Sequence, residues 1–271
     1  MGREMEKAKY KFSSEKCNGT KYSSQRKRII FLGTNGWYDT GTGNTTCILI
    51  ETKREFIILD AGNGLYKIGR YIRTRKPIYL FLSHFHFDHI VGFHTLNKFN
   101  FSQGIDIYGP PGIRKYLTTI IAKPYTVPIK QLKTKIRLNE LNRRAPSINV
   151  KFRKLVHPTV CYGFRFILED KIISYCSDTG VCDNLFLLAK DADLLITECS
   201  HKSGYEDKNW PHLNPESAAY VAKESRAKKL VLVHFDASLY LTMNDRNDAE
   251  IQAKKIFKNT FVAVDNTEIE I

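Results

Sequence analysis

The sequence predicts an α/β protein arranged as a four-layer αββα sandwich, with two stacked β-sheets and helices on their outer faces. Strand-like apolar runs outnumber helical patterns and follow one another in groups, which is typical of stacked sheets. A chain of 271 residues with 42% hydrophobic residues is long enough for one large domain with its own core. A polar, histidine-rich segment comes directly after a buried strand, where open α/β sheets carry their chemistry.

The predicted elements begin at residue 28, after a basic leader over residues 1–27 that lacks apolar periodicity. Apolar runs bounded by turn residues predict strands at 28–32, 46–50, 56–59, 78–82, 105–108, 135–138, 150–156, 162–168, 171–175, 194–197, 230–233 and 260–264. Amphipathic patterns predict helices at 64–74, 112–122, 184–190, 215–225 and 249–258. Pro215 suits a first helical turn, with Asn214 as its cap. We therefore assign residues 28–271 to one domain.

The net charge of +14 is concentrated in two segments. Residues 1–28 hold nine basic against three acidic residues, and residues 130–154 hold nine against one. These segments favour binding of a polyanion such as RNA, although a solubilising tail and a solvated edge explain them equally well. No run of apolar residues is long enough for a membrane span or a signal peptide. We therefore expect a cytoplasmic protein without a membrane partner.

The segment from residue 84 to 89 places three imidazoles and a carboxylate within six positions: His84, His86, Asp88 and His89. Imidazole nitrogens and carboxylate oxygens are the ligands that zinc and neighbouring divalent metals prefer. Three protein ligands with an open coordination position are typical of a catalytic metal site. A histidine-rich surface loop is a much weaker explanation, because further candidate ligands follow downstream.

Those candidates are His157, Asp178 and His234, each at or just beyond the end of a predicted strand, together with His212. A carboxylate such as Asp178 can bridge two closely spaced metals with its two oxygens. Taken singly, a strand-end histidine is more often a residue that only makes hydrogen bonds. Together with the segment at 84–89, these positions supply the ligands that two metals require.

The order His-x-His-x-Asp-His followed by His157, Asp178 and His234 resembles the metallo-β-lactamase superfamily from about residue 28 onward. Asp60, in the matching segment Leu59-Asp60-Ala61-Gly62, corresponds to a structural acid near the site. Within the superfamily, the chain is most similar to the phosphodiesterase branch, which includes ribonuclease Z and a small cyclic-phosphate phosphodiesterase. The segments that carry this similarity are Tyr108-Gly109-Pro110-Pro111-Gly112, Ser177-Asp178-Thr179, Leu195-Ile196-Thr197-Glu198-Cys199 and His212-Leu213-Asn214-Pro215-Glu216-Ser217-Ala218-Ala219.

The resemblance implies two metal sets, with His84, His86 and His157 in the first and Asp88, His89 and His234 in the second. Asp178 would bridge them, and the metals would be zinc, with manganese or iron as alternatives. It also implies that His212 lies by the scissile phosphate with Glu198 behind it, although His212 could instead cap the following helix. A homodimer is the implied assembly.

Two features depart from ribonuclease Z. Only 21 positions separate His157 from Asp178, which leaves no room for the tRNA-gripping arm of that enzyme. Gly180 also stands where the resemblance implies an arginine. Both favour a compact phosphodiesterase with a smaller substrate.

The main hypothesis is therefore a phosphodiesterase that acts on a nucleotide or other phosphodiester through a hydroxide formed on two metals, with Asp88, His212 and Glu198 as the catalytic group. The alternative is an endo- or exoribonuclease similar to ribonuclease Z that acts on tRNA or other RNA. A metal-stabilised RNA-binding module without turnover is a weaker alternative, since every expected ligand of an enzyme is present. An iron oxygenase is also weaker, since it does not require His212.

Overall fold

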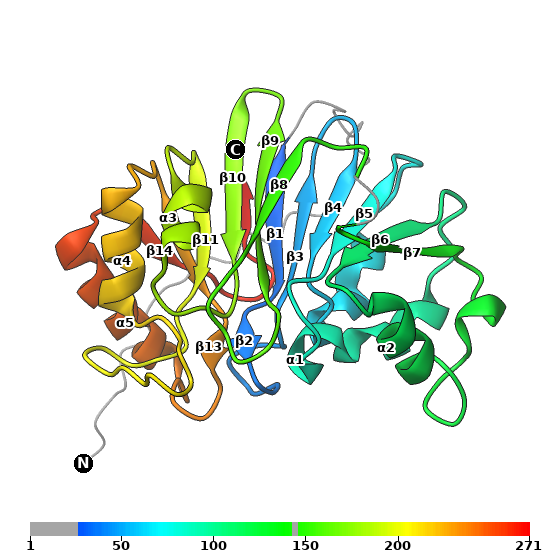
Figure 1. Ribbon diagram of the computed structural model, residues 1–271, viewed down its shortest axis with the longest axis horizontal. Helices are drawn as coiled ribbons and strands as arrows, with labels where there is room; N and C mark the ends of the chain where they lie inside the picture. Colours follow the sequence, from blue (N-terminus) through cyan, green and yellow to red (C-terminus); the bar gives the residue numbers. More distant parts are fainter. Residues whose placement is uncertain (1–26, 143–145) are drawn as a thin grey trace, which may run out of the picture.

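A computed structural model describes residues 27–142 and 146–271, and these residues form the predicted four-layer α/β sandwich (Figure 1). The first sheet runs in the order β15-β1-β3-β4-β5-β6-β7. Strands β15, β1, β3 and β4 are antiparallel neighbours, and β4 to β7 are parallel. Its strands are β15 (Glu268–Glu270), β1 (Arg28–Gly33), β3 (Cys47–Glu51), β4 (Phe56–Leu59), β5 (Ile78–Phe81), β6 (Ile105–Gly109) and β7 (Ile136–Glu140).

The second sheet runs in the order β14-β12-β11-β10-β9-β8. Strands β14, β12, β11 and β10 are parallel, whereas β9 pairs antiparallel with both β10 and β8. Its strands are β14 (Thr260–Val262), β12 (Leu230–Val233), β11 (Leu194–Glu198), β10 (Lys171–Cys176), β9 (Tyr162–Leu168) and β8 (Val150–Lys154). A separate parallel pair joins β2 (Asn35–Gly36) to β13 (Phe235–Asp236).

The helices cover the two outer faces and leave three apolar layers between the elements. The 3₁₀ helices η1 (Asn63–Arg70), η2 (Val91–Lys98) and η3 (Ile129–Gln131) and the α-helices α1 (Phe87–Ile90) and α2 (Ile113–Ile120) lie beside the first sheet. Helices α3 (Asp183–Ala189), α4 (Pro215–Glu224) and α5 (Met243–Ile256) cover the second. Phe31, Phe81, Phe164 and Phe166 belong to the layer between the sheets. Strands buried on both faces explain the continuous apolar runs in the sequence.

Two helix predictions need correction. The segment expected to be a helix at 64–74 is a 3₁₀ helix that ends at Arg70, because it packs tightly against β1: a Cβ on Gly64 would lie 2.6 Å from the Leu32 backbone. Helix α5 begins at Met243 rather than at 249, since Thr242 and Asp245 form a capping box at its start. The short elements β2, β13, β15, α1, η2 and η3 were not predicted.

The part of the leader before Lys27, together with Arg143 and Arg144, lies outside the described residues. Within the ranges that the structure describes, no helix combines the length and apolar character that crossing a bilayer requires.

Candidate metal centre

The segment after β5 presents four of the predicted ligands from the first sheet. His84 and His86 lie in the connection to α1, and His86 is the residue that precedes the helix, with an extended backbone. Asp88 and His89 lie in the first turn of α1. Because a short helix follows the strand at once, side chains from an extended segment and from a helical turn converge on one place.

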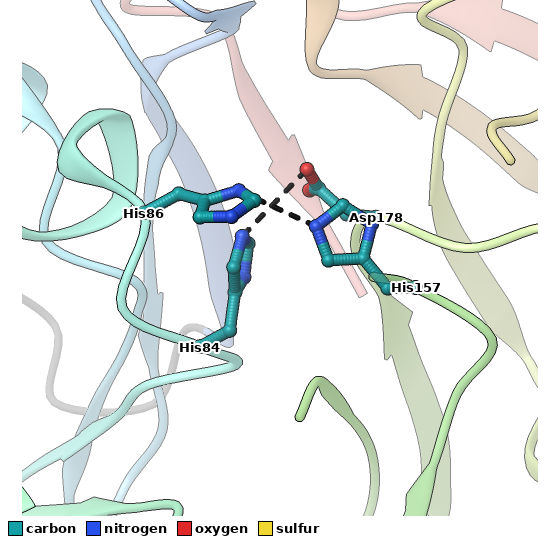
Figure 2. A group of neighbouring side chains, drawn as sticks. All are labelled: His84, His86, His157 and Asp178. Carbon is teal, nitrogen blue, oxygen red and sulfur yellow. Dashed lines mark hydrogen bonds and ion pairs between the residues drawn. The ribbon is translucent and has the colours of Figure 1, made fainter. Parts of the chain in front are cut away.

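The second sheet contributes the remaining three predicted ligands. His157 follows β8, Asp178 follows β10, and His234 stands between β12 and β13. Figure 2 shows His84, His86, His157 and Asp178 pointing toward one another. The structure therefore brings all seven predicted metal ligands together at one edge of the sandwich, where the carboxyl ends of β5, β10 and β12 meet.

The first group consists of His84, His86, His157 and Asp178, and the second of Asp88, His89 and His234. In each group the potential ligand atoms all lie within 4.8 Å of one another. In the first, His157 Nε2 is 3.3 Å from His86 Nδ1. In the second, His234 Nε2 is 3.0 Å from His89 Nε2 and 3.1 Å from Asp88 Oδ2.

Asp178 lies between the two groups. Its Oδ2 is 3.8 Å from His84 Nε2 in the first group. Its Oδ1 is 3.2 Å from His89 Nε2 and 3.3 Å from His234 Nε2 in the second. Each carboxylate oxygen thus faces a different group, which is the arrangement that a bridging ligand needs.

Hydrogen bonds behind the histidines leave their other ring nitrogens for a cation. His89 Nδ1 donates to Asp60 Oδ2 (2.9 Å), and Ser83 Oγ lies 2.9 Å from His84 Nδ1. Ser200 Oγ lies 3.0 Å from His234 Nδ1. Such partners fix the ring orientation and tautomer of metal-binding histidines.

The donors suit a divalent cation. The buried Nε2 of His84 has no hydrogen-bond partner among the described residues, although it points into the cluster. Burial lowers the pKa of His84 well below its usual range and that of His157 to about 4, so both rings are neutral and keep a lone pair. Burial disfavours the charged forms of Asp88 and Asp178, yet the neighbouring His89 and His234, whose own pKa values these carboxylates raise despite burial, hold both carboxyl pKa values well below the usual range. A bound cation would take the place of the protons on these two rings. Two ionised carboxylates among imidazoles form the donor set that zinc-like ions prefer.

His212 and Glu198 lie beside the cluster as a buried pair. His212 Nδ1 donates to Glu198 Oε1 over 2.6 Å. The His212 ring centroid is 5.5 Å from that of His157 and 6.1 Å from that of His234, so the ring borders both groups. Burial alone would lower the pKa of His212, but the Glu198 carboxylate raises it to about 9. His212 does not cap α4, because Asn214 occupies that position in a capping box with Ser217.

Several residues at the site were not predicted from the sequence. The indole of Trp210 lies parallel to the His86 ring, with an angle of 4° and a centroid distance of 5.9 Å. The Trp37 backbone N–H donates to Asp88 Oδ2 over 2.8 Å. The Tyr175 hydroxyl donates to Asp60 Oδ2 over 2.6 Å. Of these residues, only Trp210 could have been placed at the site from the sequence, because it stands two residues before His212.

Two stacked sheets with outer helices, and a histidine and aspartate cluster at their common edge, define a metal-binding α/β protein. The chain belongs to the beta-lactamase superfamily domain family, whose model matches residues 56–235. The sequence-based assignment to this superfamily and its four-layer fold is confirmed.

Similar proteins align with most of the chain. Ribonuclease Z of Lactobacillus helveticus is 29% identical, over 90% of this chain and 97% of its own length. The probable metallo-hydrolase YhfI of Bacillus subtilis is 26% identical over 76% of this chain and 86% of its own. Its crystal structure superposes with a TM-score of 0.75 at 23% identity, covering 91% of this chain and all of YhfI. Human tRNase Z, short form, gives a TM-score of 0.69 at 24% identity, covering 89% of this chain and 98% of its own.

Proposed function

We propose that this protein is a metal-dependent phosphodiesterase with two divalent metal ions, zinc before manganese or iron. One observation carries the proposal: Asp178 directs one carboxylate oxygen at each of two ligand groups, and the His212–Glu198 pair lies beside both. The similarity to ribonuclease Z and to a probable metallo-hydrolase supports the same chemistry. His84, His86 and His157 would hold one ion, and Asp88, His89 and His234 the other, with Asp178 shared between them.

Metal ions in such a site polarise the phosphoryl oxygens and lower the pKa of a bound water toward neutrality. Asp88 is held in place by the Trp37 N–H, so its carboxylate can orient the attacking water from a fixed position. The residues behind the ligands, among them Asp60 and Ser200, keep the imidazoles aligned.

His212 supplies the proton that the leaving oxygen requires. Its Nδ1–H is engaged by Glu198, which leaves the proton on Nε2 for the leaving group. Glu198 is 0% exposed and also accepts the Thr179 N–H over 2.6 Å, so its carboxylate cannot swing away from the imidazole. Glu198 is therefore a positioning residue, and His212 is the general acid.

Hydrolysis of bis-p-nitrophenyl phosphate tests the proposal. Metal-loaded wild type should release p-nitrophenol, and chelated protein should not, because it lacks the ions that polarise the phosphoryl oxygens. His212→Ala should be slower by about 10²- to 10⁴-fold, the usual contribution of a general acid. His94→Ala is a matched control, because His94 lies on η2 and its imidazole bonds to the Val91 carbonyl rather than to a candidate ligand. A protein that binds metal but cleaves no diester would contradict the proposal.

A ribonuclease is the second candidate, favoured by the relatives named ribonuclease Z and by the basic segment at 130–154. Six basic side chains in the described part of this segment are exposed, namely Lys130, Lys133, Lys135, Lys151, Arg153 and Lys154. Against tRNA as the substrate, the interval between His157 and Asp178 is filled by the hairpin of β9 and β10, without an inserted arm.

RNA cleavage that weakens steeply with salt, and weakens again when Arg143 and Arg144 are neutralised, would favour the ribonuclease. Activity on RNA that is insensitive to salt would count against it. The homodimer and the cytoplasmic location stay predictions, which sedimentation and fractionation would test.

A further inference from the structure

Three large aromatic side chains are exposed around the candidate metal centre. Trp37 exposes 65% of its surface, Phe87 75% and Trp210 49%. They come from three separate segments: the loop after β2, the first turn of α1 and the loop before α4. Because large apolar side chains gain stability when buried, a group of exposed ones marks a binding surface.

Trp37 and Trp210 contact candidate ligands, and Phe87 is the chain neighbour of two of them. The Trp37 backbone donates to Asp88, and Phe87 stands between His86 and Asp88 in the chain. The Trp210 ring stacks on His86 and meets the His157 ring edge-on, at a centroid distance of 5.9 Å in both contacts. These contacts place the indole against two candidate ligands, while half of its surface stays open to solvent.

We propose that Trp210 is a stacking platform for a nucleobase carried by the substrate, with Phe87 and Trp37 at the rim of the same subsite. The inference rests on the proposed phosphodiesterase activity and names its substrate class as nucleotide diesters. An indole that is already in contact with its neighbours can bind a planar aromatic ring, because offset stacked rings attract one another. Little conformational entropy is lost on contact. Stacking of this kind accepts any base, so it confers a preference for nucleotides without a preference for sequence.

The chain also links the platform to the general acid. Trp210 precedes His212 by two residues, so one short loop carries both the base-stacking ring and the proton donor. A base stacked on Trp210 would bring its attached phosphate toward the ligand groups, and binding energy from the base would then position the reacting bond.

Comparing two substrates measures the contribution of the nucleobase to catalysis. Thymidine 5′-(p-nitrophenyl phosphate) and methyl p-nitrophenyl phosphate release the same product, but only the first carries a nucleobase. Trp210→Leu should lower the ratio of kcat/KM between the two substrates by about 5- to 150-fold, the equivalent of about 1–3 kcal/mol per stacked base. Trp210→Tyr should restore most of the ratio, because a phenol ring also stacks. Tyr125→Leu, which removes an exposed aromatic between α2 and η3, is the matched control and should leave the ratio unchanged.

Fluorescence gives a readout that does not depend on turnover. The chain has only two tryptophans, so Trp37→Phe leaves Trp210 as the sole reporter. Adenosine 5′-monophosphate should quench this reporter in a saturable manner, in chelated as well as metal-loaded protein, and ribose 5-phosphate should not. Metal analysis of Trp210→Leu and Trp210→Tyr would show that His86 and His157 still hold their ion.

The outcomes separate the two proposals. If neither diester is hydrolysed while adenosine 5′-monophosphate quenches Trp210, the phosphodiesterase proposal fails and the base-stacking subsite stands. If both diesters are hydrolysed and Trp210→Leu leaves their ratio within twofold, the stacking proposal is overturned. Equal quenching by ribose 5-phosphate and by the nucleotide would overturn it as well.

Discussion

Glu198 Oε1 lies 2.6 Å from His212 Nδ1, and the same carboxylate accepts the backbone N–H groups of Thr179 and Ser200. Thr179 follows Asp178 in the chain, and Ser200 bonds to His234. One buried carboxylate therefore fixes the position of the proposed general acid relative to the loops that carry two proposed metal ligands.

This pair predicts a non-additive double mutant. Glu198→Gln should lower kcat by about 10- to 100-fold, because a neutral amide no longer favours the imidazolium, and His212→Ala should cost about 10²- to 10⁴-fold. The double variant should be no slower than His212→Ala alone, since Glu198 acts through His212. Steady-state kinetics of the four proteins measures the coupling, and additive losses would contradict the positioning role.

Asp178→Asn should reduce the binding of both metal ions, because each oxygen of the native carboxylate faces one ligand group. His84→Ala should weaken mainly the first group. Elemental analysis after dialysis against a weak chelator gives the stoichiometry. His212→Ala is the control with full metal content, and a normal metal content in Asp178→Asn would argue against a bridge.

Gly36→Ala should disturb the second group without unfolding the protein. An added Cβ would lie 2.6 Å from the His234 ring, so either the ring or β2 must move. We expect at least about a tenfold loss of kcat/KM, since small misplacements of catalytic groups are costly. Gly41→Ala, with open space around its Cβ, should behave like wild type in the same assay. Equal activities of the two variants would refute the prediction.

Arg246→Met should destabilise the fold by about 2–4 kcal/mol, because it removes a buried cation together with the hydrogen bonds that its guanidinium donates. Arg246 is 0% exposed, donates to Thr34 and Asn35, and lies 4.7 Å from the centroid of the Phe235 ring. Urea denaturation measures the change. Lys228→Met, which breaks an ion pair with Asp193 at the surface, should move the urea midpoint far less than Arg246→Met does.

The start of α5 should be sensitive to acid. The Lys202 ammonium and the Thr242 hydroxyl lower the pKa of Asp245 to about 2, below the usual value near 3.8. A lowered folded-state pKa adds stability that is complete above pH 3.8 and is lost as the pH falls toward 2. Asp245→Asn should therefore be less stable than wild type at pH 7, and the difference should shrink at pH 3. Urea midpoints at the two pH values test this, and a constant difference would contradict it.

The strands and the clustering of the candidate ligands could be predicted because their signals are local or stand at the ends of predicted strands. Strands such as β4 (Phe56–Leu59) are apolar throughout because both of their faces are buried, and the candidate ligands from His84 to His89 are neighbours in sequence. The stacking of Trp210 on His86 and the bond from Ser200 to His234 join residues that are distant in sequence, and single tryptophans and serines carry no pattern. The two-residue strands β2 and β13 were too short to show a period, and each exists only because the other lies beside it.

The seven proposed ligands are divided between two sheets whose strands, among the described residues, do not pair with one another. An ion held by His84 and His157 would thus cross-link the two sheets, in addition to the short β2–β13 pair. Loss of the metal would then lower the stability of the protein as well as its catalytic activity. Without metal, the two sheets would separate more often and expose the chain to proteases. The supply of metal would then set the lifetime of the protein as well as its rate of catalysis.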